Sequence, residues 1–391
     1  MPWKEVKPMD QKLLFIADYL REALTFSALC QRYGISRKTG YKWIARYQEL
    51  GFPGLQDQSR RPARHPLKTP HTIRKAILEL RSGFQDPPGP KKIRVFLARN
   101  HPDWQIPSKT TIYNILREEG RIRPQKHRNR VPAGPSPFSP VSEPNDLWSV
   151  DFKGQFKTQD GIWCYPLTVM DHQSRYLLAC QNFEGPRFEP TQQVFARLFR
   201  TYGLPLRIRS DNGSPFASRS PAGLSQLSKW WIRLGILPER IAPGKPQQNS
   251  RHERMHRTLK QAVAIPPAQT PGLQQQAFDR FCDYYNNERP HEGLEQQTPS
   301  SQYQQSPRCM PEKLPDLEYP GHFRTNLVHH SGVINHQGHR VYIAGLLNGE
   351  HVGLEEIADG VWDVYFGPLR LGSFDMRQIT KAHNDYLKLN V

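Results

Sequence analysis

The chain has 391 residues, and its 54 Lys and Arg against 36 Asp and Glu give a formal net charge of +18. This length exceeds one ordinary core, so we expect three or more domains, and so basic a balance favours nucleic acid over a membrane surface as the partner. The five cysteines are scattered without a C-x-x-C pair, which argues against a disulfide framework or a zinc knuckle. Because we find no signal-peptide pattern and no apolar run of membrane-spanning length, we expect a cytoplasmic protein.

Residues 1–53 have the pattern of three helices that form a helix-turn-helix unit. Apolar residues recur at helical spacing from Leu13 to Leu20, and Ser36 stands where a side chain caps the first turn of a third helix. In this motif the N-terminal part of the recognition helix enters the major groove of DNA. A three-helix bundle that binds protein is the alternative. The candidate DNA contacts on the third helix are Arg37, Lys38, Thr39 and Lys42.

Residues 54–68 follow as an expected basic linker in which arginines and prolines are mixed. Such an arm could lie in a minor groove of DNA, although a solvated spacer fits the same composition. The candidate DNA contacts in it are Arg60, Arg61 and Arg64.

Residues 69–120 repeat the pattern of the first unit, so we interpret them as a duplicated helix-turn-helix. Two linked helix-turn-helix units are expected to bind a long composite DNA site, because linkage raises the effective concentration of the second unit once the first has bound. The positions that recur at the same spacing are Ser36, Thr39, Tyr41 and Ile44 in the first unit and Ser108, Thr111, Tyr113 and Leu116 in the second. The candidate DNA contacts in the second unit are Lys109, Thr110, Thr111 and Asn114.

Residues 121–145 are basic and then proline-rich, which predicts a semi-rigid linker and the clearest domain boundary. Arg128 and Arg130 in this linker are further candidates for DNA contacts.

From residue 146 to residue 305 the pattern predicts an α/β domain. Strands and helices are expected in the order β-β-β-α-β-α-β-α, with Trp163–Met170 as one unbroken strand of an antiparallel hairpin. Asp171 falls in the turn of that hairpin, where we expect it to act as a turn residue. Residues 306–323 are expected to form a linker, and the short strands with Gly-containing turns in residues 324–391 predict a small SH3-like β-barrel.

Three carboxylates of the α/β domain stand at the ends of expected elements. Asp151 lies on the first strand, Asp211 ends the fourth, and Glu253 lies at the start of the helix after the fifth. Carboxylates that converge at one sheet edge repel one another unless divalent cations neutralise them. Oxygen ligands alone select Mg²⁺ or Mn²⁺ over zinc, and two such ions can clamp the attacking and leaving oxygens of a phosphodiester.

The helix that carries Glu253 also carries Arg257 and Lys260, at i+4 and i+7 on the same face. One carboxylate beside two cations suits a site that holds a metal ion next to a phosphate chain. The structural alternatives are a capping box of Ser250 with Glu253 and an ordinary salt bridge from Glu253 to Arg257. His252 and His256 flank Glu253, and we expect them to contact DNA or partner chains.

Four stretches of the chain resemble DDE transposases of the retroviral-integrase superfamily, most closely bacterial insertion-sequence transposases with an integrase catalytic core. They run from Trp148 to Gly154, from Arg209 to Phe216, from Pro243 to Lys260 and from Tyr284 to His291. With the helix-turn-helix units and the expected barrel, the resemblance covers nearly the whole chain.

This resemblance implies an RNase H-like core and a polynucleotidyl transferase that uses two Mg²⁺ or Mn²⁺ ions. Such an enzyme frees a 3′-OH at the transposon ends, and the hydroxyl then attacks target DNA without a covalent enzyme intermediate. Asp151, Asp211 and Glu253 would be the catalytic residues and metal ligands. The residues implied to contact DNA near them are Gln248, Asn249, Arg257 and Lys260.

The resemblance also implies partners and a location. The partners would be the terminal inverted repeats and target DNA, brought together by at least a dimer in a nucleoid-associated bacterial protein, with no membrane involved. Two departures stand out: 41 residues separate Asp211 from Glu253, against a familiar thirty-five, and Ser250 occupies a position where relatives often carry glycine.

Two other functions fit parts of the pattern. A DNA-binding regulator with an inactive core is the first, but all three carboxylates are present, which favours activity. An RNase H-type nuclease is the second, but it would not need two DNA readers and basic linkers.

Overall fold

The computed structural model of the chain describes residues 8–57, 68–122, 138–152, 154–378 and 387–389. Its contacts divide the chain into two compact units, Met1–Lys68 and Thr69–Val391. None of the described helices has the length and apolar character that a membrane span requires. The candidate DNA contacts that lie outside the described residues are Arg60, Arg61, Arg64, Arg128 and Arg130.

The first unit is a bundle of three helices with the order of a helix-turn-helix. Its elements are α1 (Pro8–Leu20), α2 (Phe26–Arg32), α3 (Arg37–Leu50) and a short 3₁₀ turn, η1 (Phe52–Leu55). Ser36 caps α3 as predicted, because its hydroxyl accepts the Thr39 backbone N–H at 3.2 Å. The three helices pack closely where α3 carries Gly40, since a Cβ there would lie 2.8 Å from Cys30 Sγ.

A second three-helix bundle begins the second unit. Its helices are α4 (His71–Ser82), α5 (Pro90–Asn100) and α6 (Lys109–Glu118). Ser108 caps α6 in the way that Ser36 caps α3, with its hydroxyl 3.1 Å from the Thr111 backbone N–H. The shared cap agrees with the predicted duplication. The buried core of this bundle includes Ile77, Ile93, Leu97, Ile112 and Leu116.

A mixed five-stranded sheet in the order β5-β4-β1-β6-β7 forms the centre of the second unit. Its strands are β1 (Leu147–Phe152), β4 (Leu167–Asp171), β5 (Leu177–Gln181), β6 (Arg207–Ser210) and β7 (Leu237–Arg240). Strand β1 runs antiparallel to β4 and parallel to β6. The expected single strand Trp163–Met170 is wrong: it divides at Pro166 into β4 and a separate hairpin of β2 (Phe156–Lys157) with β3 (Trp163–Cys164). Proline cannot donate a ladder hydrogen bond, so the strand breaks there.

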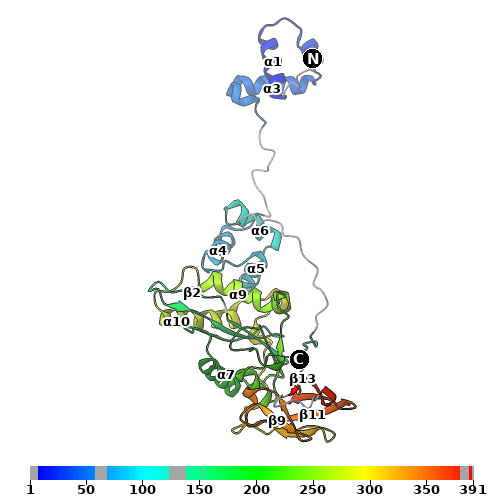
Figure 1. The fold of residues 1–391 in the computed structure, drawn as a ribbon. Helices are drawn as coiled ribbons and strands as arrows, with labels where there is room; N and C mark the ends of the chain where they lie inside the picture. Colours follow the sequence, from blue (N-terminus) through cyan, green and yellow to red (C-terminus); the bar gives the residue numbers. More distant parts are fainter. Residues whose placement is uncertain (1–7, 58–67, 123–137, 153, 379–386, 390–391) are drawn as a thin grey trace. The chain divides into compact units, whose positions relative to one another are not determined.

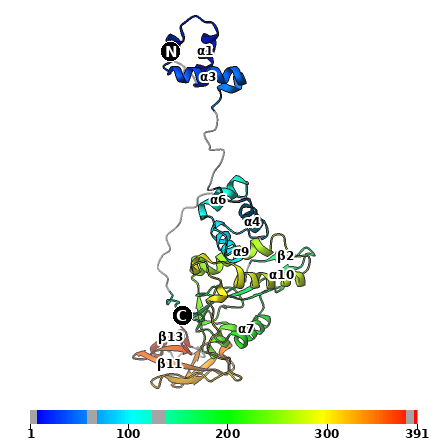
Figure 2. The same cartoon turned by 180° about the vertical axis from the view of Figure 1, so that it is seen from behind.

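Helices cover both faces of this sheet. They are α7 (Phe188–Tyr202) and α8 (Gln226–Arg233) on one face, and α9 (Ser250–Val263) and α10 (Pro271–Asp283) on the other. Figures 1 and 2 show α9 and α10 on the opposite side of the sheet from α7. Trp148 and Val150 pack into the core under α7 and α8. Because successive strand residues point to opposite faces, Ser149 and Asp151 face α9.

A π-helical turn, η4 (Tyr284–Glu288), follows α10 and closes the core. Asn286 in this turn accepts the Leu177 backbone N–H at 2.8 Å and donates to the Leu177 carbonyl at 2.9 Å. The side-chain amide therefore continues the sheet beyond β5. The remaining short helical turns are η2 (Pro221–Gly223), η3 (Pro246–Asn249), η5 (Glu292–Leu294), η6 (Pro299–Ser301), η7 (Gly345–Leu347) and η8 (Met376–Gln378).

The C-terminal strands form two open sheets. One has the order β13-β12-β11-β8 and the other β14-β10-β9. Their strands are β8 (Arg324–Leu327), β9 (Val333–His336), β10 (His339–Tyr342), β11 (His351–Ala358), β12 (Val361–Phe366), β13 (Leu369–Asp375) and β14 (Leu387–Lys388). The described strands form no closed barrel, so the SH3-like prediction is not supported. The Gly-containing turns in the sequence indicated where the strands lie, but they could not specify which strands pair with each other. Ile232 of α8 packs into the core between these sheets.

Candidate active site

Two of the three predicted carboxylates lie near the ends of neighbouring strands, Asp151 on β1 and Asp211 directly after β6. In the parallel pairing of β1 with β6, Ser149 lies beside Arg209. Asp151 and Asp211 each follow that pair by two residues, and neighbouring strands are about 4.8 Å apart. The register therefore places Asp151 and the residue that follows β6, Asp211, toward the same end of the sheet.

Glu253 reaches this end of the sheet from α9. Ligand atoms of Asp151, Glu253 and His256 all lie within 4.8 Å of one another, with Asp151 half-buried, Glu253 exposed and His256 buried. Two carboxylates and an imidazole nitrogen at this spacing fit a divalent cation. Asp211 is not a member of this group of described residues.

Asp211 instead contacts its own turn. Its Oδ1 accepts the Gly213 backbone N–H at 3.1 Å, and Asn212 donates through Nδ2 to the Ile241 carbonyl at 2.8 Å. Asn212 and Gly213 thus shape the turn after β6 and direct the Asp211 carboxylate toward it. The structure thus brings Asp151, Glu253 and His256 together, while the Asp211 carboxylate bonds to its own turn.

Neither structural alternative for Glu253 is present. Helix α9 begins at Ser250, so its N-cap is Asn249, which makes no side-chain capping hydrogen bond. The predicted capping box is wrong because the 3₁₀ turn η3 runs directly into α9 and moves Ser250 inside the helix. Within the described residues, Glu253 forms no ion pair with Arg257. Glu253, Arg257 and Lys260 are all exposed, on one face as predicted.

The two histidines of α9 are buried, which corrects the expectation that they contact DNA or partner chains. His252 is 0% exposed and His256 is 1% exposed. They lie with Met255 and Leu259 on the side of α9 that packs against the sheet. Positions 252, 255, 256 and 259 follow the i, i+3, i+4, i+7 spacing of a buried helix face, so the sequence did hold this signal.

A chain of polar contacts connects these histidines to the strands. His252 Nδ1 lies 2.8 Å from Ser149 Oγ, and its Nε2 lies 2.7 Å from Thr168 Oγ1. His256 Nε2 is also 2.7 Å from Thr168 Oγ1, and its Nδ1 is 3.6 Å from Asp151 Oδ2. Ser149 and Thr168 are fully buried. Buried polar groups with partners of this kind hold side chains in one orientation.

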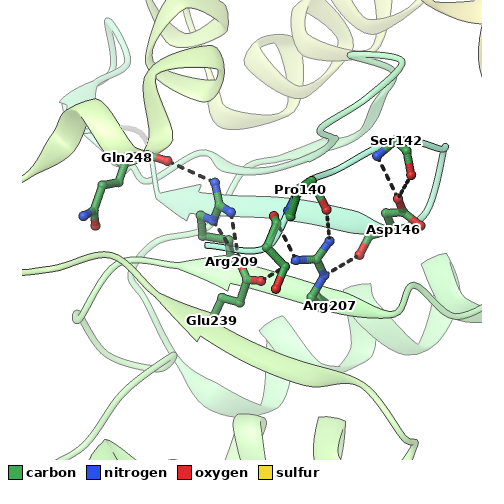
Figure 3. Close-up of polar contacts among 8 residues, drawn as sticks. Pro140, Ser142, Asp146, Arg207, Arg209, Glu239 and Gln248 are labelled. Atoms are coloured by element: carbon green, nitrogen blue, oxygen red, sulfur yellow. Dashed lines mark hydrogen bonds and ion pairs between the residues drawn. The ribbon is translucent and has the colours of Figure 1, made fainter. Parts of the chain in front are cut away.

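A second polar cluster fixes the loop in front of α9 (Figure 3). Arg209 donates to Glu239 Oε2 at 2.8 and 3.0 Å and to the Gln248 carbonyl at 3.1 Å. Arg207 binds the other oxygen of Glu239 at 2.8 Å. Burial lowers the pKa of Arg209, and the neighbouring Glu239 opposes that shift. The cluster joins β6 and β7 to the loop that leads to Glu253.

Gln248 and Asn249, two predicted DNA contacts, are held against the protein. Gln248 Oε1 accepts the Ala242 backbone N–H at 2.7 Å. Asn249 is only 3% exposed. The predicted DNA contacts on the two recognition helices are more exposed to solvent. Arg37, Lys38 and Lys42 on α3 and Lys109 and Thr110 on α6 are exposed, whereas Thr39, Thr111 and Asn114 are half-buried.

Comparison with known families agrees with this architecture. Residues 141–246 and 234–299 match two families described as integrase core domains. Residues 11–63 match a helix-turn-helix domain, and residues 39–116 match a homeodomain-like domain. Residues 324–382 match the C-terminal domain of IS481 family transposases. This combination of integrase core, helix-turn-helix and IS481-type C-terminal domains fits an insertion-sequence DDE transposase.

Individual relatives of this integrase core match it over part of its length. The Gag-Pol polyprotein of baboon endogenous virus is 26% identical over 177 residues, which are 45% of this chain and 10% of that polyprotein. The retrovirus-related Pol polyprotein from transposon TNT 1-94 of Nicotiana tabacum is 34% identical over 101 residues, 25% of this chain and 7% of the other. The chain thus spans about a tenth of the length of these curated relatives.

Two solved integrase structures also resemble the chain. The HTLV-2 integrase catalytic core domain in complex with magnesium is 16% identical, with a TM-score of 0.34, and covers 41% of this chain and 98% of that one. The simian T-cell lymphotropic virus intasome, in complex with the PP2A regulatory subunit B56 gamma, is 17% identical, with a TM-score of 0.38, and covers 71% and 93%.

Proposed function

We propose that the protein is an insertion-sequence transposase that binds the ends of its element, cleaves them to free a 3′-OH and joins that hydroxyl to target DNA. The observation that supports this most is that Asp151 on β1 lies within ligand spacing of Glu253 on α9, while Asp211 directly follows the neighbouring strand β6. This trio lies in an integrase core that follows two helix-turn-helix bundles.

Asp151, Asp211 and Glu253 are the proposed catalytic residues and metal ligands. Two bound Mg²⁺ or Mn²⁺ ions would supply the Lewis acidity that activates the attacking oxygen and stabilises the leaving oxygen. Asp151 and Glu253 hold cations from β1 and α9. Asp211 would join them once its carboxylate leaves the Gly213 N–H, which its Oδ1 accepts at 3.1 Å.

The exposed cations are proposed to position DNA. Arg257 and Lys260 lie on the exposed face of α9 beside Glu253, where they meet the phosphates of the strand being cut. The recognition helices α3 and α6 read the transposon ends. Because two ends must be joined in concert, the active form is at least a dimer on DNA. The proposed domains are 1–53, 69–120, 146–305 and 324–391, joined by linkers.

One observation favours a second candidate, a DNA-binding regulator with an inactive core. The Asp211 carboxylate lies outside the Asp151–Glu253–His256 group. In that case the protein binds the ends but its Asp211 never completes the site.

Cleavage of labelled end DNA separates these functions. We expect the parent protein with Mg²⁺ or Mn²⁺ to nick the DNA that flanks its gene at the 3′ end of the element. Asp151→Asn should bind the same DNA with unchanged affinity and cleave it at least about 100-fold more slowly. Specific binding by the parent without cleavage in either metal would favour the regulator.

The salt dependence of binding tests whether both helix-turn-helix bundles contact the end DNA. Lys38→Ala and Lys109→Ala should each weaken end binding and lower the slope of log K against log salt by about 1, because each removes one phosphate contact. Lys313→Ala, an exposed lysine outside both bundles, is the matched control and should change neither.

A further inference from the structure

The buried polar chain beneath Asp151 orients His256 and favours a proton on its Nε2. The Thr168 hydroxyl has three neighbours: the Asp151 backbone carbonyl at 3.0 Å and the Nε2 atoms of His252 and His256, each at 2.7 Å. A carbonyl only accepts, and a hydroxyl offers one proton and two lone pairs. When Thr168 gives its one proton to the carbonyl or to His252, His256 donates to Thr168 from Nε2.

A neutral His256 with its proton on Nε2 has a lone pair on Nδ1. This Nδ1 lies 3.6 Å from Asp151 Oδ2 and shares ligand spacing with Glu253. The Ser149 hydroxyl donates to the Met170 carbonyl at 3.2 Å, and its oxygen lies 2.8 Å from His252 Nδ1. An imidazole nitrogen and two carboxylates within 4.8 Å of one another form a donor set for a cation.

We propose that His256 Nδ1 is a metal ligand in addition to Asp151 and Glu253, so that the site has a nitrogen donor. The inference rests on the proposed function, because it concerns the same metal site. It revises the predicted oxygen-only ligand set. Mg²⁺ strongly prefers oxygen, whereas first-row transition metals accept imidazole readily, so His256 biases the site toward Mn²⁺ over Mg²⁺.

The rest of the polar chain positions this ligand. A ligating histidine usually donates its second ring N–H to a fixed acceptor, which sets the tautomer and the ring orientation. Thr168 is that acceptor for His256, and His252 with Ser149 holds Thr168 in place from the other side. His252 is accordingly a positioning residue, since it contacts Thr168 and its ring packs edge-on against the ring of His256, with centroids 4.6 Å apart.

Pulsed EPR of the full chain loaded with Mn²⁺ alone tests the proposal without DNA or turnover. We expect modulation from a directly coordinated ¹⁴N that changes when histidine is labelled with ¹⁵N. His256→Gln should lose this nitrogen coupling, and its Mn²⁺ affinity should fall by about tenfold or more while its Mg²⁺ affinity changes less. His336→Gln, which alters a buried histidine of the C-terminal sheets, is the matched control and should keep the coupling.

Asp151→Asn distinguishes failure of the inference from failure of the proposed function. Mn²⁺ binding that depends on Asp151 but lacks nitrogen coupling would overturn the role of His256 and leave the transposase site intact. Mn²⁺ binding that is insensitive to Asp151→Asn would overturn both. The labelled parent decides the first point even if His256→Gln fails to fold.

Discussion

At the scale of single residues, Asp171 illustrates an acidic side chain with a structural role. It is fully buried, and burial raises its pKa. Its Oδ1 accepts the Asn145 backbone N–H at 2.8 Å, and its Oδ2 accepts the backbone N–H and the hydroxyl of Ser174 at 2.7 and 2.6 Å. The carboxylate thus closes the turn between β4 and β5, which confirms the turn role predicted from the sequence.

Replacing the Asp171 carboxylate should lower the stability of the fold, because its role is structural and not catalytic. We expect Asp171→Ala to lower the free energy of unfolding by about 2–4 kcal/mol, because it leaves buried donors of Asn145 and Ser174 without their acceptor. Urea unfolding followed by tryptophan fluorescence measures the change. Asp103→Ala, at an exposed position, should stay within about 0.5 kcal/mol of the parent. Equal effects of the two substitutions would contradict the role of Asp171.

The carboxylates and the histidines differ in how readily the sequence reveals them. The sequence nominates Asp151, Asp211 and Glu253 because each stands near the end of an expected element inside a recognisable stretch. The burial of His252 and His256 follows from the same spacing as Met255 and Leu259, but histidine is polar and also suits DNA contact. Their contacts with Thr168 could not be predicted, because they depend on how α9 packs against β4.

At the scale of elements, the Arg209–Glu239 pair connects the sheet to the loop before α9. Both side chains are nearly buried, and Arg209 also binds the Gln248 carbonyl. Arg209→Met should lower the free energy of unfolding by about 2–4 kcal/mol, since it leaves the buried Glu239 with Arg207 alone. Hydrogen exchange should also speed up in residues 243–249. Arg200→Met, at an exposed site on α7, is the control. Unchanged hydrogen exchange of residues 243–249 in Arg209→Met would show that Arg209 does not hold this loop.

Local patterns predicted most elements but few of their junctions. Helix caps at Ser36 and Ser108 and the strands around Asp151 and Asp211 follow from short-range chemistry. The junctions depend on tertiary context: the π-helical turn at Tyr284–Glu288 forms where Asn286 can bond β5, and η3 removes the capping box of Ser250. Pairing of the C-terminal strand edges is likewise a long-range property.

At the scale of the whole molecule, the second helix-turn-helix bundle contacts the integrase core within one compact unit. Asp86 pairs with Arg289, Lys91 pairs with Glu292, and Arg99 donates to the Glu288 carbonyl at 3.1 Å. Lys92 lies in the same region, and burial together with the nearby Arg289 lowers its pKa to about 8.

This half-buried lysine gives the second unit a predictable pH dependence. Its pKa is about 8 when folded and 10.5 ordinarily, so the unfolded chain binds the extra proton between those values and stability rises with pH across that window. Lys92→Met should therefore stabilise the protein at pH 7, by about 1–2 kcal/mol, and lose this advantage toward pH 10.5. Thermal unfolding at pH 7 and pH 10 measures this. Lys91→Met, whose lysine is exposed, should show no such pH-dependent gain; a parallel response in both variants would contradict the assignment to Lys92.

Strand transfer in vitro tests the central claim, that Asp151, Asp211 and Glu253 form one catalytic site in a transposase. The assay combines the purified full chain, Mg²⁺ or Mn²⁺, the two ends of the element and a target plasmid, alongside Asp211→Asn. The account predicts joined product from the parent and none from Asp211→Asn, although both bind the ends equally well. Joined product from Asp211→Asn at the parent's rate would contradict it, because Asp211 would then have no part in the chemistry.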